Sequence, residues 1–228
     1  MGLLRLLLSG NLNIWSVIAY ILSALAVIFL TLPVHEFAHG LTATKLGDPT
    51  PRYEGRVTIN PFAHIDYIGA ACILLFGFGW AKPVQVNTNY FKNPKRDMAI
   101  TAVAGPLANI LMAFLALLLL NGLLPALEAT GSQVLYYVVI FFSYLAQINV
   151  YLAVFNLIPI PPLDGSRLLW AILPYKQYYA LMRYERYIFY GLLALIWLGV
   201  LDTPLAFLSG GLLKGLSYVA ELPFRLIG

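Results

Sequence analysis

Residues 14–39 read IWSVIAYILSALAVIFLTLPVHEFAH, and this stretch decides the fold. It begins with an uncharged apolar run over residues 14–34 that is long enough to cross a bilayer as one helix. The run passes without a break into residues 35–39, HEFAH. Pro33 predicts a kink and not a helix end, because neighbouring helices can satisfy the backbone group that it frees. We therefore expect the first span to carry polar side chains within its own helix, close to one membrane face.

The composition also indicates a membrane protein. Of 228 residues, 61% are hydrophobic and 11% are charged, whereas soluble domains are about 45–50% apolar and about 25% charged. This balance excludes a soluble globule and a disordered tail, and the single cysteine, Cys72, excludes a disulfide scaffold. The net charge of +4 lies on connecting segments, so it indicates orientation in a membrane and no nucleic-acid partner.

Further apolar runs complete an α-helical polytopic membrane protein with about five to six transmembrane or re-entrant helices. Met98–Leu120, Val134–Ile158 and Tyr187–Leu201 predict spans. Pro204–Val219 predicts either a last crossing or an interfacial helix. Ile68–Ala81 would be roughly 21 Å long as a helix, which is short for a crossing.

The charges of the loops favour a re-entrant path for Ile68–Ala81. If this segment dips into the membrane and returns, all basic clusters lie on the cytoplasmic side, and the loops with Glu128 and Asp202 lie outside, as the positive-inside rule expects. The N-terminus is then outside, and the short loops fit a cell inner membrane. The clusters are Lys45, Arg52 and Arg56; Lys82, Lys92, Lys95 and Arg96; and Arg167, Lys176, Arg183 and Arg186.

Residues 35–39 have the spacing of a zinc site. On a helix, His35 and His39 lie on one face and can bind one Zn²⁺, and Glu36 is placed to take a proton from a zinc-bound water. Five-residue matches of this kind also arise by chance on solvated helix faces. Here, however, the three polar residues end an uncharged membrane run, where each costs a few kcal/mol without a partner. A metal explains them better.

A catalytic zinc needs a third protein ligand. Thr42 and Lys45 occupy the positions where metzincins have a glycine and a third histidine, and the only other histidine is His64. The best carboxylate is Asp164, in residues 156–165 (NLIPIPPLDG) at the end of the third long span. By the charge argument, this end lies on the same side of the membrane as the histidines.

Three motifs in this order resemble the site-2 protease family of intramembrane zinc metalloproteases. They are HEFAH at 35–39, GPLAN at 105–109 and N-x-x-P-x-x-P-x-D-G at 156–165. The resemblance covers roughly residues 14–173. It is to short members of the family, without PDZ or nucleotide-sensing domains, so it does not indicate how substrates are selected.

This resemblance implies regulated cleavage of a transmembrane protein substrate within the lipid bilayer, with one Zn²⁺ per chain. His35, His39 and Asp164 would be the ligands and Glu36 the base. Asn156 would contact the substrate carbonyl or the tetrahedral intermediate. Residues 1–228 would then form one membrane-embedded domain, with its core motifs in 14–173 and C-terminal helices in 187–219.

Residues 52–60 (RYEGRVTIN) predict a short strand or hairpin, because polar and β-branched residues alternate around a glycine. Its edge would bind an extended substrate backbone, with Val57, Thr58 and Asn60 as candidate contacts. The region 52–67 also resembles the membrane-associated hairpin of short family members.

Three further polar residues have more than one interpretation. His64 and Asp66 would hold the hairpin, orient a metal ligand or cap a turn. Asn109 either supports a metal ligand or forms a hydrogen bond between helices, and the second role is more typical of an asparagine within a span.

Two other functions compete with a protease. A divalent-metal transporter would need polar residues on several spans, and two of the predicted spans have no such residues in their interiors. A catalytically inactive membrane scaffold would not need to keep His35, Glu36, His39 and Asp164 together.

Overall fold

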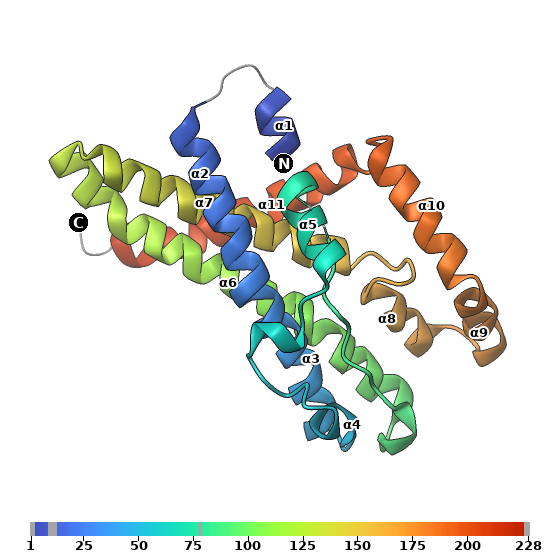
Figure 1. The fold of residues 1–228 in the computed structure, drawn as a ribbon. Coiled ribbons are helices and arrows are strands. Elements are labelled where there is room, and N and C mark those ends of the chain that lie inside the picture. The colour runs from blue at the N-terminus through green and yellow to red at the C-terminus, as the bar shows by residue number, and fades with distance from the viewer. Residues whose placement is uncertain (1–2, 9–12, 78, 226–228) are drawn as a thin grey trace.

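The protein, seen in a computed structural model, is a bundle of helices; residues 3–8, 13–77 and 79–225 are described (Figure 1). Four of its helices are long and apolar enough to cross a membrane, so it is a membrane protein. These are the continuous helix Ile14–Lys45, α6 (Pro94–Thr130), α7 (Gln133–Asn156) and α11 (Asp202–Arg225). The shorter helices are α1 (Leu3–Leu8), α4 (Thr50–Tyr53), α5 (Tyr67–Phe76), α8 (Gly165–Ile172), α9 (Tyr175–Arg183) and α10 (Glu185–Trp197).

The first span carries the histidine motif in its own helix, which confirms the expectation. It consists of α2 (Ile14–Ala26), a π-helical turn η1 (Val27–Thr31) and α3 (Leu32–Lys45). Pro33 has no N–H to donate to the preceding turn, and the irregular turn lies directly before it. The helix therefore continues through the proline, with an irregular turn before it.

The core of the bundle forms where α6 and α7 pack side by side and the first span crosses them (Figure 1). Buried residues of α2, α5, α6, α7 and α11 make one cluster, which includes Tyr20, Ile73, Leu117 and Leu152. The Tyr20 hydroxyl donates to the Ile73 carbonyl at 3.2 Å and ties α5 to the first span. In Figure 1, α10 stands apart from this core on one side.

The predicted β-hairpin at 52–60 is wrong, since no strand occurs among the residues that the structure describes. The segment begins as the helical turn α4, and Gly55 then reverses the chain with φ +67°. The Arg56 N–H donates to the Pro51 carbonyl at 2.8 Å. The alternation of side chains was real, but no second strand offers the hydrogen bonds that a hairpin needs.

The segment after η2 (Pro61–Ala63) makes an excursion and returns, as the re-entrant interpretation expected. Its ends meet where the Lys82 N–H donates to the His64 carbonyl at 2.7 Å. The helix of this excursion, α5, has only 10 residues, or about 15 Å, which is short for a crossing.

The returning chain, residues 79–87, runs along α3. The Val84 N–H donates to Glu36 and the Asn87 N–H to Asp48, and the Asp48 N–H itself donates to the Ala43 carbonyl. These bonds place the returning chain alongside α3, from Glu36 to the turn at Asp48 that follows the helix. No structure was predicted for residues 82–87.

Two predicted boundaries differ from the observed helices. The loop expected near Asn121 is helical, because α6 continues to Thr130 and ends at Gly131 with φ +58°. The span predicted at 187–201 is wrong: this region is α10, whose 13 residues are too few for a crossing, and it is not among the four helices long enough to span. The region 204–219 lies within α11, which is one of those four.

Gly69→Ala should separate the returning chain from α5, because a Cβ at Gly69 would overlap the Trp80 carbonyl. We expect a loss of about 1–3 kcal/mol of stability, measured by thermal unfolding in detergent. Gly191→Ala is the matched control, since a Cβ there meets nothing within 4 Å and should be neutral or slightly stabilising. Equal unfolding temperatures for the two variants would contradict this packing.

Candidate metal centre

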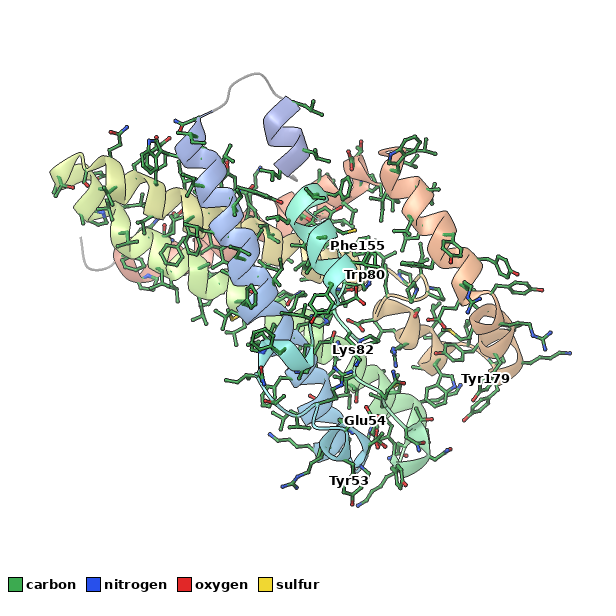
Figure 2. The ribbon with its side chains drawn as sticks, viewed as in Figure 1. Tyr53, Glu54, Trp80, Lys82, Phe155 and Tyr179 are labelled. Carbon is green, nitrogen blue, oxygen red and sulfur yellow. The ribbon has the colours of Figure 1, made fainter. Side chains whose placement is uncertain are left out.

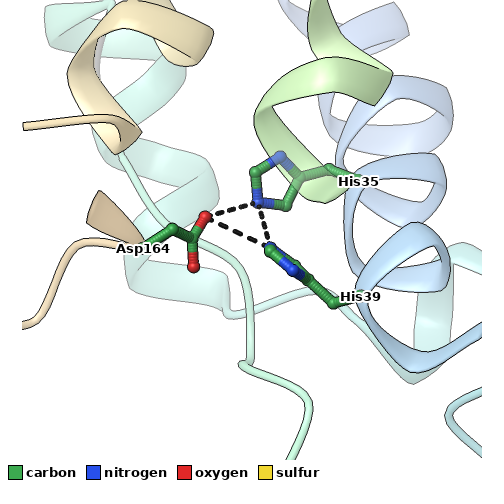
Figure 3. A group of neighbouring side chains, drawn as sticks. All are labelled: His35, His39 and Asp164. Carbon is green, nitrogen blue, oxygen red and sulfur yellow. Dashed lines mark hydrogen bonds and ion pairs between the residues drawn. The ribbon is translucent and has the colours of Figure 1, made fainter. Parts of the chain in front are cut away.

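The first two side chains of the site are imidazoles of α3, and their Nε2 atoms lie next to each other (Figure 3). His35 and His39 are one helical turn apart, and their Nε2 atoms lie 3.1 Å from each other. Both side chains are buried. Since each presents Nε2 to the same point, the pair is arranged as the helix spacing of the motif predicts.

Asp164 completes the group from a distant part of the chain. Its Oδ2 lies 3.2 Å from the Nε2 of His35 and 3.2 Å from that of His39. The carboxylate stands at the start of α8, where the chain turns back after α7. A Cβ at Gly165 would overlap the carbonyls of Leu157 and Ile158, so only glycine allows this tight turn.

The three atoms fit one metal ion. Ligands at about 2.0–2.1 Å on a zinc tetrahedron are about 3.3 Å from one another, and the observed separations are 3.1 to 3.2 Å. Two imidazole nitrogens and a carboxylate oxygen are also a usual donor set for catalytic zinc. Among the residues that the structure describes, His35, His39 and Asp164 are the only group of three or more such ligands.

Helix α6 packs against both histidines. The Thr101 carbonyl lies 2.7 Å from His39 Nδ1, which would fix the proton there and leave Nε2 free for a metal. A Cβ at Gly105 would overlap both imidazole rings. The glycine of the GPLAN motif therefore allows α6 to approach the ligands closely.

Glu36 lies beside the ligands but is not one of them. Its carboxylate is buried, and Oε2 accepts a hydrogen bond of 3.0 Å from the Val84 N–H. Because the returning chain, residues 79–87, supplies this donor, the orientation of Glu36 depends on a residue that is 48 positions away in the sequence.

A cavity of about 750 Å³ opens onto this group. His35, Glu36, Asp164 and Asn156 all line it, so the structure brings Asn156 to the site. The returning chain and α10 both line the cavity, and they touch each other where the rings of Trp80 and Phe189 pack edge to face, with centroids 5.7 Å apart. Figure 2 shows Trp80 and Phe155, two of the aromatic lining residues.

The other candidate residues hold local turns. Thr58 Oγ1 accepts from the Asn60 N–H, and Asn60 Oδ1 accepts from the Phe62 N–H. Neither these residues nor Val57 belongs to the lining of the cavity. The strand on which their proposed role rested is absent.

His64 and Asp66 shape the entry to the re-entrant segment. His64 is fully buried, with Nε2 2.9 Å from the Thr58 carbonyl. Asp66 caps α5 by accepting from the Gly69 N–H at 2.9 Å. The His64 side chain thus ties the start of the excursion to the preceding turn, and Asp66 caps the helix of the excursion.

Comparisons with known proteins point in one direction. The profile of peptidase family M50 matches residues 120–199. "Putative zinc metalloprotease YwhC" of Bacillus subtilis is 39% identical over 163 residues, 68% of this chain and 73% of that protein. "Putative zinc metalloprotease MJ0611" of Methanocaldococcus jannaschii is 32% identical over 173 residues, 69% and 77% of the two chains. "Putative zinc metalloprotease Rip2" of Mycolicibacterium smegmatis is 32% identical over 142 residues, 60% of this chain and 51% of that protein. No solved structure matches significantly.

Gly105→Ala should push α6 away from the histidines and weaken metal binding. We expect the zinc affinity of the purified protein to fall at least about tenfold, as when groups that support metal ligands are disturbed. Gly122→Ala, on the same helix, is the control, because its nearest neighbour is the Phe224 ring at 3.4 Å. Competition with a chelator measures both, and unchanged affinity in Gly105→Ala would refute the close approach.

Proposed function

Because this chain belongs to peptidase family M50, the site-2 protease family, and is a zinc metalloprotease, we propose that it cleaves membrane proteins in or near a transmembrane segment. One observation carries the proposal: His35, Glu36 and Asp164 line one cavity among the helices, and His39 completes a group of three metal-binding side chains with His35 and Asp164. A site in that position is accessible to a substrate that is itself embedded in the lipid bilayer.

In this proposal His35, His39 and Asp164 hold the zinc ion. A zinc ion held by these residues would supply Lewis-acid chemistry, polarising a substrate carbonyl oxygen and making a water molecule more acidic. Removing any one of the three residues would leave too few ligands for a stable site.

Glu36 moves the proton. Since Oε2 is held by the Val84 N–H, the second oxygen, Oε1, takes the proton of the attacking water and later delivers it to the leaving amine nitrogen. Asn156, on the wall of the same cavity, is placed to donate a hydrogen bond to the substrate carbonyl oxygen, on which negative charge develops.

The substrate must unwind locally, because a peptide bond within a helix is shielded by its own turn. Its backbone groups then need partners in an apolar site. We assign this clamp to residues 79–87 in place of 52–60. Lys82 and Val84 direct their N–H groups to one edge, so alternation turns Pro83 and Gln85 to the other. Pro83 lines the cavity.

The proposed setting is a cell inner membrane, with the site towards the cytoplasm and the N-terminus outside. The C-terminal end of α3 packs near the start of α6, because Ala43 and Leu46 form one cluster with Phe91 and Met98. Both ends are basic, with Lys45 on α3 and Lys95 and Arg96 on α6. The positive-inside rule places such an end in the cytoplasm. In this setting, cleavage would release a cytoplasmic segment of the substrate, as in regulated intramembrane proteolysis.

Glu36→Gln tests the proposal directly. The variant keeps all three ligands, so its zinc content should equal that of the wild type, while cleavage of a model transmembrane substrate should fall by about 10²–10⁴. His35→Ala should lose both zinc and cleavage. If Glu36→Gln cleaves as fast as the wild type, Glu36 is not the base.

Gln85→Pro tests the clamp, since it removes one backbone donor from the edge beside the cavity. An extended backbone accepts proline without strain, so the zinc content should not change. We expect cleavage to fall at least tenfold, about the effect of one or two lost hydrogen bonds. Gln85→Ala changes the same side chain and keeps the N–H, so it should cleave normally. Equal rates for the two variants would count against this edge.

A further inference from the structure

His35 lacks the partner that its neighbour has. The Thr101 carbonyl lies beside Nδ1 of His39, but Nδ1 of His35 is buried without any hydrogen-bond partner among the described residues. Metal-binding histidines almost always donate their other N–H to an acceptor, which fixes the tautomer and the ring orientation. Some other group therefore has to accept from His35.

Asn109 is the buried polar side chain next along α6. Thr101, Gly105 and Asn109 follow one another at intervals of four residues, so they share one face of the helix. The first lies against His39 and the second against both imidazoles. The next turn of α6 therefore lies at the level of His35, or one turn beyond it towards Thr31.

Asn109 is fully buried. Neither the oxygen nor the nitrogen of its side-chain amide has a hydrogen-bond partner among the described residues. Burying an unpaired amide costs on the order of 1–3 kcal/mol, and such groups call for a specific explanation. Asn109 Oδ1 is an acceptor and His35 Nδ1–H is a donor, so each supplies what the other needs.

A second buried asparagine, on α7, contacts the first span one turn before His35. Asn149 of α7 is fully buried and donates through Nδ2 to the Thr31 hydroxyl at 3.4 Å and to the Leu145 carbonyl at 2.8 Å. Its Oδ1 has no partner among the described residues. Thr31 is one turn before His35 on the same helix. An unused acceptor for the Asn109 Nδ2 group is therefore available on the helix that packs against α6.

We propose that Asn109 is the positioning residue of His35 in the zinc-loaded protein: its Oδ1 then accepts from His35 Nδ1–H, and its Nδ2 group donates towards Asn149 Oδ1. The four atoms are unpaired among the described residues, so each is free to form these bonds. The buried polar atoms of α3, α6 and α7 then satisfy one another. His35 is held with Nε2 towards the metal, as the Thr101 carbonyl holds His39. This inference rests on the proposed zinc site and adds to it the residues Asn109, Asn149 and Thr31.

Zinc affinity of purified variants tests this role without using proteolysis. Asn109→Leu keeps the size of the side chain and removes the acceptor, so the affinity measured against a chelator should fall by about 10–100-fold. Asn109→Asp restores an acceptor and should recover most of the affinity. Asn121→Leu replaces another buried asparagine three turns further along α6 and should bind zinc as the wild type does.

Nitrogen-15 NMR of labelled histidines provides the second measurement, and the chain has only three histidines to assign. In the zinc-loaded wild type, His35 should show a protonated Nδ1 that exchanges slowly with water. In Asn109→Leu this protection should disappear, whereas His39 should keep its own.

The outcomes separate this inference from the proposed function. If Asn109→Leu folds and binds zinc as tightly as the wild type, Asn109 does not position His35, and the zinc site itself stands. If Asn109→Leu fails to fold, the wild-type spectrum decides: a rapidly exchanging or unprotonated Nδ1 of His35 overturns the inference. A wild type that binds no zinc would instead overturn the proposed ligand set.

Discussion

Two buried imidazoles and the partly buried carboxylate of Asp164 lie 3.1 to 3.2 Å from one another inside an apolar bundle, and the rest of the structure depends on this constraint. In an apolar interior, an imidazole or a carboxylate without partners is costly, and two imidazoles with one carboxylate compensate each other around a cation. The close separations of 3.1 to 3.2 Å require a glycine in α6 and a sharp turn before α8. Gly105 and the turn at Gly165 are far apart in the sequence, yet both are needed to bring His35, His39 and Asp164 together.

The returning chain, residues 79–87, holds the carboxylate of Glu36, the proposed base. His64 joins the two ends of the excursion, and from there the returning chain reaches Glu36 through the Val84 N–H. The same backbone that holds the base also borders the cavity. A substrate bound along this edge would therefore lie next to the oxygen that moves the proton, without any separate positioning element.

The sequence predicted those features whose cause is local or compositional. Apolar length and the HEFAH spacing predicted the first span with its two histidines, and the charge of the loops predicted the excursion at Ile68–Ala81. The hairpin at 52–60 was wrong, because side-chain alternation does not show whether a partner strand exists. Residues 82–87 were missed, because their partners are the carboxylates of Glu36 and Asp48, 48 and 39 residues away. Such pairings depend on tertiary packing and leave no periodic pattern.

The central claim is that one zinc ion is held by two imidazoles and one carboxylate. X-ray absorption spectroscopy of the zinc-loaded, detergent-solubilised protein measures this ligand set directly. The account predicts two imidazole nitrogens and oxygen donors at about 2.0–2.2 Å, with no sulfur. A sulfur shell at about 2.3 Å, which only Cys72 or a methionine of this chain could supply, or a shell with a single imidazole, would contradict it.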